Sequence, residues 1–195
     1  MFALFLACAP SAPMFIDKAG IDKARVNNDT VAACAGLSMK DAEVRTYAAE
    51  KLSTWKRPQP CVCEHLVRDG GWDAAVLKGL TKVTEDERVA CAGDLLDDAA
   101  LPDRVGLARA LSGFLAPAVR ARLATAAAAD ADPEVRAVAI VTLRPDKDES
   151  ARAILVAALA DPLPSVRAAG ATALAGLAAT APAVATLAHD PEPSV

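Results

Sequence analysis

Four of the five cysteines and one of the two histidines are the residues of this chain best suited to chemistry. Cys61, Cys63 and His65 occupy alternate positions, and Cys34 and Cys91 lie on either side of them in the sequence. Thiolates and an imidazole are zinc ligands, and a distant cysteine would complete a tetrahedral site. The spacing is unusual for zinc, however, and no Cys-x-x-Cys pair accompanies it. We therefore predict no metal site.

Two other interpretations of these cysteines remain open. In an oxidising compartment four cysteines would form two disulfides, with three connectivities to choose from. In a reducing compartment they would be free, buried thiols. We expect at least one disulfide, with the Cα atom of Cys61 or Cys63 about 4.4–6.8 Å from that of Cys34 or Cys91.

The remaining candidate residues favour structural roles. His189 precedes Asp190 at a predicted helix C-terminus, where an imidazolium interacts favourably with the helix dipole. Trp55 and Trp72 either mark a binding hot spot or fill irregular packing. The sequence contains no Gly-rich phosphate loop, nucleophile elbow or His-Glu-x-x-His motif. We predict that the chain is not an enzyme and takes no cofactor.

An apolar run at residues 2–7 precedes Cys8, and Pro and Ser residues follow it. This pattern resembles the lipobox of bacterial lipoprotein signal peptides, and the resemblance implies that Cys8 carries a lipid anchor in the bacterial envelope or periplasm. The run lacks a basic start and is shorter than the usual 7–15 residues. The alternative is an apolar N-terminus of a cytoplasmic protein. No apolar stretch of about 20 residues occurs, so we expect membrane contact only through this anchor.

An Asp-Pro pair recurs every 29 residues, beginning at Asp132, Asp161 and Asp190. A constant period near 30 in an Ala- and Leu-rich chain predicts a helical repeat. At the first pair Asp132 suits a helix cap and Pro133 the first helical position, and in the next unit either Asp161 or Ser165 could be the cap. A helix over 41–52 matches the helices that follow the first two pairs. Its core positions recur at a spacing of four residues, as Val44, Ala48 and Leu52, then Val135, Ala139 and Leu143, then Val166, Gly170 and Leu174.

The predicted start of the repeats divides the chain into two parts. Residues 1–28 are predicted to hold the signal-like segment, a tether and a short polar helix, and 29–195 the repeats. The repeats are regular at 41–52 and 130–195 and degenerate at 53–115. Second helices are expected at about 116–130, 148–160 and 181–189. Because Asp190 to Val195 repeats the opening of the previous unit, we expect a further repeat beyond Val195.

The pattern Asp-x-x-Val-Arg-x-x-Ala-x-x-x-Leu resembles the HEAT repeat family, and its short period resembles the subclass named after phycobilisome lyases. The resemblance implies an all-α fold, a right-handed α-solenoid of antiparallel helix pairs that binds another protein. It implies a structural ladder between repeats at Asp41, Arg45, Asp132, Arg136, Asp161 and Arg167. Binding residues would project from the second helices on the concave face, with Arg120, Arg122 and Arg152 as candidates.

Composition excludes some partners. The net charge is −4 and aromatic residues make up 4% of the chain, whereas nucleic-acid binders normally carry a basic stripe. We therefore expect a protein partner and no nucleic acid. The main alternative is a phycobilisome-type chromophore lyase or isomerase, which requires an aromatic-lined pocket. A DNA-binding or glycosylase module is a second alternative, and chromophore absorbance and a salt-dependent DNA-binding assay would distinguish the three.

Overall fold

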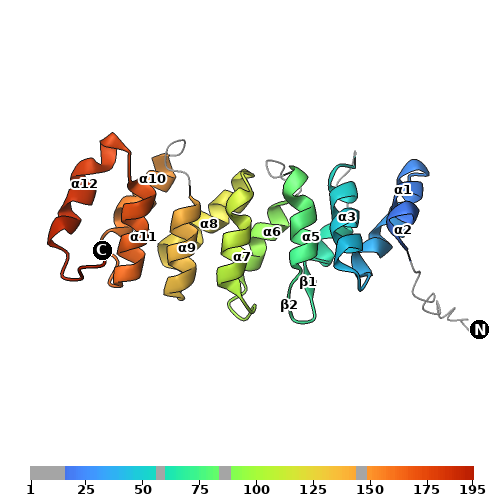
Figure 1. Ribbon diagram of the computed structural model, residues 1–195, viewed down its shortest axis with the longest axis horizontal. Helices are drawn as coiled ribbons and strands as arrows, with labels where there is room; N and C mark the ends of the chain where they lie inside the picture. The colour runs from blue at the N-terminus through green and yellow to red at the C-terminus, as the bar shows by residue number, and fades with distance from the viewer. Residues whose placement is uncertain (1–15, 56–59, 84–88, 144–148) are drawn as a thin grey trace, which may run out of the picture.

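The structure, a computed structural model, describes residues 16–55, 60–83, 89–143 and 149–195. Over these ranges the chain is mostly helical, with twelve α-helices, short 3-10 turns and one hairpin of two-residue strands. The all-α prediction is confirmed. The helices lie side by side in one elongated row, with α1 at one end and α12 at the other (Figure 1).

The elements follow one another in a regular order along the chain. The helices are α1 (Lys18–Val26), α2 (Thr30–Ala35), α3 (Ala42–Ser53), α4 (Pro60–Glu64), α5 (Ala74–Gly79), α6 (Ala90–Asp94), α7 (Arg104–Ala110), α8 (Pro117–Ala129), α9 (Pro133–Thr142), α10 (Glu149–Ala158), α11 (Pro164–Leu174) and α12 (Ala181–Ala185). The strands are β1 (Val67–Arg68) and β2 (Gly71–Trp72). The 3-10 turns are η1 (Gly36–Ser38), η2 (Leu80–Val83), η4 (Leu95–Asp97), η5 (Leu111–Gly113), η6 (Ala178–Thr180) and η7 (Thr186–His189).

The helices form two layers. In the first layer α3 packs against α5, α7 against α9, and α9 against α11. In the second layer α6 packs against α8, and α8 against α10. Contacts of α8 with α9 and of α10 with α11 join the layers. In Figure 1 the first layer lies in front of the second. Helices α8 and α10 and the α12–η7 segment occupy the ranges predicted for second helices.

A series of aspartates marks the start of each unit. Each carboxylate accepts a backbone N–H two or three residues later. At four of these positions, Asp41, Asp73, Asp103 and Asp132, the N–H belongs to the first turn of a helix, which leaves such donors free. Helix α11 instead begins at Pro164 with Leu163 as its N-cap, so Asp161 bonds the turn before that helix. The series is Asp41, Asp73, Asp103, Asp132, Asp161 and Asp190. Successive members are 32, 30, 29, 29 and 29 residues apart. The aspartate spacing therefore persists at Asp73 and Asp103, within the range where the sequence pattern is degenerate because these two aspartates lack a following Pro.

Small residues set the distance between neighbouring helices. A Cβ atom added at Gly79 of α5 would lie 2.4 Å from the Thr46 carbonyl oxygen and 2.6 Å from the Ala49 Cβ of α3. At Gly170 of α11 an added Cβ would lie 3.2 Å from the nearest Leu159 methyl carbon. The predicted core positions of the two regular units are buried, at Val135, Ala139, Leu143, Val166, Gly170 and Leu174.

The β1–β2 hairpin connects three successive units. Its turn is Asp69-Gly70, with φ of 53° and 81°, and two residues with positive φ suit a tight type I′ hairpin turn. Arg68 Nη1 donates to the Met39 carbonyl at 3.1 Å, and Trp72 Nε1 donates to the Asp103 carbonyl at 3.2 Å. Trp72 is half-buried, so it packs between units and is not part of an open patch.

Trp55 also packs inside the structure. Its side chain is buried, and its Nε1 donates to Asn28 Oδ1 at 3.0 Å. Of the two interpretations of the tryptophans, the structure therefore favours packing where the repeat is irregular.

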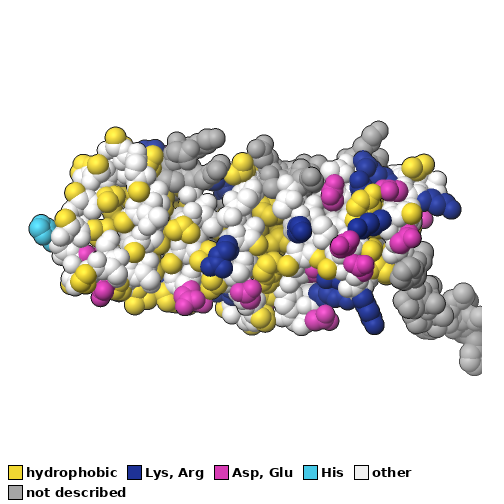
Figure 2. All heavy atoms as spheres, in the orientation of Figure 1, with side chains coloured by type: hydrophobic (Ala, Val, Ile, Leu, Met, Phe, Trp, Pro, Cys, Tyr) yellow, Lys and Arg dark blue, Asp and Glu magenta, His cyan; other side chains and the backbone are white. Residues whose placement is uncertain are grey.

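Charge is unevenly distributed along the row. On the face shown in Figure 2, Lys, Arg, Asp and Glu side chains gather at the end formed by α1 and α3. There Lys18 pairs with Glu43 at 2.8 Å, and the Tyr47 hydroxyl donates to the Asp22 carboxylate. At the other end, no Asp, Glu, Lys or Arg occurs in the sequence between Arg167 and Asp190.

Candidate functional site

Two disulfides join α2, α4 and α6 in series and thereby extend the second layer, to which α6 belongs, toward the N-terminus. Cys34 of α2 is bonded to Cys61 of α4, with the Cα atoms 6.0 Å apart. Cys63 of α4 is bonded to Cys91 of α6, with the Cα atoms 5.8 Å apart. This pairing is one of the three connectivities that the sequence allowed. All four thiols that a zinc site could have used are therefore in disulfides.

Helix geometry explains why Cys61 and Cys63 bond to different helices. Successive residues of an α-helix are rotated by about 100°, so Cys61 and Cys63 point in nearly opposite directions, about 200° apart. One thiol therefore reaches the helix before α4 and the other reaches the helix after it. Helix α4 has only 5 residues, and helices this short are unstable by themselves. The two bridges fix it between its neighbours.

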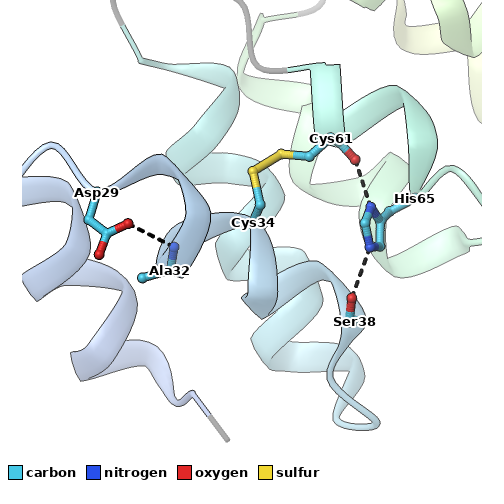
Figure 3. The surroundings of a disulfide bond; sticks show 6 residues. All are labelled: Asp29, Ala32, Cys34, Ser38, Cys61 and His65. Atoms are coloured by element: carbon cyan, nitrogen blue, oxygen red, sulfur yellow. Dashed lines mark hydrogen bonds between the residues drawn. A yellow bond between two sulfur atoms is a disulfide. The ribbon is translucent and has the colours of Figure 1, made fainter. Parts of the chain in front are cut away.

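His65 adds a polar connection beside the first bridge (Figure 3). Its Nδ1 lies 2.8 Å from the Cys61 carbonyl oxygen and its Nε2 lies 2.9 Å from Ser38 Oγ. A carbonyl oxygen only accepts, so Nδ1 donates, and in the neutral imidazole Nε2 then accepts the hydroxyl proton of Ser38. The ring thus joins the end of α4 to η1. His189, the other histidine, is exposed in η7.

Buried ion pairs form a ladder between units of the first layer. Three rungs share one geometry, in which the arginine Nε and Nη2 donate to the two oxygens of one carboxylate. The Nε–oxygen distances are 2.7 Å for Arg45–Asp73, 3.1 Å for Arg136–Asp161 and 2.6 Å for Arg167–Asp190. The Nη1 of each arginine donates to backbone carbonyls five or six residues earlier. The arginine side chains are only 12–13% exposed.

The structure corrects the predicted acceptors of this ladder. Arg45 binds the carboxylate at the start of the next unit, Asp73, whereas Asp41 accepts the N–H of Glu43 in its own helix. Asp132 likewise accepts from Glu134. Asp161 is the predicted aspartate that does pair with a ladder arginine. The arginine lies one turn into its helix, so its side chain extends toward the next unit and leaves its own cap free to bind the helix N-terminus.

A fourth rung was not predicted. Arg104 binds Asp130 with both terminal nitrogens, and its Nη2 also donates to the Leu96 carbonyl at 2.6 Å. Sequence reasoning missed it because Arg104 directly follows its cap, Asp103, instead of standing four to six residues after the aspartate of its unit. Asp130 in turn lies two residues before the cap Asp132.

The ladder charges hold one another ionised. Burial by itself raises the pKa of Asp130, but hydrogen bonds from Arg104 and the Asp132 N–H, with the charge of Arg104, lower this pKa overall. The hydrogen bond from Arg167 lowers the pKa of Asp190. The same pairs raise the pKa of Arg104 and of Arg167. The ladder arginines are thus internally neutralised and serve the stacking of the units.

The three concave-face candidates differ in their surroundings. Arg122 of α8 is the most open, with its side chain 44% exposed, and it pairs with Asp94 and Asp97 at 3.0 Å each. Arg152 of α10 pairs with Glu149 of its own helix at 2.5 Å. Arg120 is half-buried. Through these two ion pairs Arg122 connects α8 to α6 and η4.

Some predictions concern features outside these contacts. Cys8 lies outside the described residues, so its acylation stays a prediction. Among the helices that the structure describes, none is long and apolar enough to cross a membrane. In the same ranges no group of three or more His, Cys, Asp and Glu side chains is placed to hold a metal ion. Comparison of the chain with protein-family models, curated proteins and solved structures found no match.

Proposed function

We propose that this chain is a non-enzymatic scaffold, a right-handed HEAT-like solenoid of antiparallel helix pairs that binds another protein along its second layer. The observation that carries the proposal is the repetition of one device, a capping aspartate and a buried Arg–Asp rung, along the described chain. Stacked units that contact mainly their neighbours form an extended surface suited to binding proteins.

The second layer offers a suitable mixture of groups. Arg122, Asp94 and Asp97 form an exposed polar network on α8, α6 and η4. Val156 of the neighbouring helix α10 is 37% exposed. Interfaces commonly combine an apolar area with a polar, hydrogen-bonding rim.

The disulfides support an extracytoplasmic location. Structural disulfides form and persist in oxidising compartments such as the bacterial periplasm. We propose that the protein is exported and held at the membrane by a lipid on Cys8. Full-length protein should then partition into detergent, and Cys8→Ser should move it to the aqueous phase. Equal partitioning of the two forms would contradict the anchor.

Site-specific photo-crosslinking tests the binding surface. A photoreactive residue at Thr125, on the second layer, should capture one dominant partner in the native cell. Excess unlabelled protein should suppress this adduct. The matched control places the same residue at Thr172, which is also exposed but lies on α11 of the first layer. Adducts of equal yield at both positions, or no competed adduct at Thr125, would contradict the proposal.

A further inference from the structure

The arginine ladder is interrupted between the unit of α5 and the unit of α7. In α3 and α9 the valine three residues after the aspartate of the unit is followed by the ladder arginine, whereas in α5 Val76 is followed by Leu77. Among the described residues, no rung of the ladder joins these two units. A guanidinium–carboxylate pair with two parallel hydrogen bonds fixes the orientation of its partners, so this junction lacks a directional constraint that the others have.

Close helix packing is interrupted at the same place. Helices α5 and α7 are neighbours in the row (Figure 1), but they do not pack as closely as α3 with α5 or α7 with α9. The described helices thus form an N-terminal part that ends with η2 and a C-terminal part that begins with α6. A single apolar core continues across the junction, and the hydrogen bond from Trp72 to the Asp103 carbonyl crosses it. Because apolar contact has no preferred direction, the two parts can rotate against each other without breaking a rung.

One of the two disulfides crosses this junction. Cys63 lies on α4 of the N-terminal part, and its partner Cys91 lies on α6. Helix α6 packs closely against α8 and therefore moves with the C-terminal part. The bond between Cys34 and Cys61, in contrast, lies within the N-terminal part. The Cys63–Cys91 bond is thus a covalent restraint on the angle between the two parts.

We propose that the junction between α5 and α7 is a hinge, and that the Cys63–Cys91 disulfide is a reducible latch that restrains it. With the latch formed, α4 and α6 are held together and the row is stiff. With the latch reduced, the two parts rotate about their apolar contact and the curvature of the second layer changes. That this layer binds a partner rests on the proposed function, whereas the hinge does not.

A dithiol reductant would open the latch by thiol–disulfide exchange. Cys63 is exposed, whereas Cys34, Cys61 and Cys91 are half-buried, and exposed disulfides are the ones that exchange readily. One thiolate of the reductant attacks the Cys63 sulfur, and Cys91 leaves as a thiolate and takes up a proton. The second thiolate of the reductant then displaces Cys63 from the mixed disulfide. The protein gains two thiols, and the reductant becomes a disulfide.

Stepwise reduction of the folded chain tests the latch. Samples equilibrated with increasing dithiothreitol are alkylated, and the labelled cysteines are identified by mass spectrometry. Cys63 and Cys91 should become labelled at lower dithiothreitol concentrations than Cys34 and Cys61. Labelling of all four together, or of Cys34 and Cys61 first, would overturn the assignment of the latch.

Single-molecule energy transfer tests the hinge. Dyes attached through non-natural residues at the exposed positions Lys78 of α5 and Thr172 of α11 report the distance between the two parts. In the latch variant, Cys63→Ser with Cys91→Ser, the distribution of transfer efficiency should shift and broaden. The matched control, Cys34→Ser with Cys61→Ser, removes a bridge of nearly equal span, 27 against 28 residues, and should leave the distribution unchanged.

Hydrogen exchange separates hinge movement from unfolding. Helices α3 and α9, one in each part, should stay protected in the latch variant. An unchanged distribution in the latch variant, an equal change in the control variant, or loss of protection in α3 or α9 would overturn the proposal. Failure of the crosslinking experiment together with a positive hinge result would overturn only the scaffold function.

Discussion

The two halves of the second layer have helices of different length and are held in place differently. In the N-terminal half α2, α4 and α6 have 6, 5 and 5 residues, and two disulfides connect them in series. In the C-terminal half α8 and α10 have 13 and 10 residues, and the sequence has no cysteine beyond Cys91. Short helices bury little apolar surface, so covalent links replace part of the packing that longer helices provide.

The first layer shows what the halves share. The Arg45–Asp73 rung lies in one half and the Arg136–Asp161 rung in the other. The two rungs have the same donor geometry, and their arginines are nearly equally buried. The ladder is therefore the common element of the repeat, and the disulfides are a local addition. We therefore expect loss of the disulfides to destabilise only the N-terminal half, and loss of a ladder arginine to destabilise whichever unit contains it.

Removing both disulfides should have the largest effect. Each bridge closes a loop of 27 or 28 residues, for which chain entropy gives about 3–4 kcal/mol of stabilisation. In the variant with Ser at all four positions, hydrogen exchange of α2, α4 and α6 should become fast while α9 and α11 stay protected. Uniform loss of protection along the chain, or none, would contradict a division into two halves.

Removing a ladder arginine should come next. Arg136→Ala leaves the Asp161 carboxylate buried without its cation and should cost about 3–5 kcal/mol in urea unfolding. The control is Arg122→Ala, whose ion pairs are exposed and should contribute about 0.2–1 kcal/mol. If both variants lose the same stability, the ladder is not the common support of the units.

Adding one methyl group between neighbouring helices should destabilise the N-terminal half more than the C-terminal half, because the helices are closer together at Gly79 than at Gly170. Gly79→Ala places a Cβ 2.4 Å from a backbone oxygen of α3 and should cost about 1–3 kcal/mol by overpacking. Gly170→Ala meets the side-chain carbons of Leu159 and Ala158 and the Leu155 carbonyl oxygen at 3.2–3.3 Å, a much milder overlap than 2.4 Å, so its cost should be smaller. Thermal melting of the two variants gives the comparison, and a larger loss in Gly170→Ala would refute it.

The sequence predicted the fold well where its repeat is marked by Pro. Helices α9 and α11 follow Asp132-Pro133 and Asp161-Pro162 and bury the predicted positions. Sequence reasoning missed Asp73, because the β1–β2 hairpin lengthens that unit, and Asp103, which starts a unit without Pro. It missed the Arg104 rung because that arginine stands out of register.

The candidate site was less predictable. Four cysteines can pair in three ways, and the choice depends on which helices are neighbours. The acceptor of each ladder arginine lies 23–28 residues away in the sequence. The local sequence pattern identifies the arginine, but it does not show whether the side chain binds the aspartate of its own unit or that of the next unit.

Acidification should give the smallest effect, confined to the C-terminal half. The pKa values of Asp130 and Asp190 lie below the ordinary value of 3.8 because of Arg104 and Arg167. A carboxyl group with a lowered folded-state pKa stabilises the fold above its unfolded pKa, and this stabilisation is lost as the pH falls through the folded value. Protection of α9 and α11 should therefore fall below about pH 4.

The variant Asp190→Asn isolates one of these groups. It removes a titrating carboxylate from the last rung, so the stability of its C-terminal half should change less with pH than that of the parent chain. Hydrogen exchange at several pH values provides the measurement. An unchanged pH dependence in the variant would show that this rung does not respond to acid.

The two disulfides on α4 also determine how the chain would respond to a pulling force. Tension applied to the two ends passes from Cys34 directly to Cys61, along Val62 to Cys63, and then directly to Cys91. The two closed loops bear no load, and about 90 Å of extended chain stays hidden in each. Stretched between a membrane anchor and a bound partner, the protein would lengthen by opening its C-terminal helices while its N-terminal half remained short.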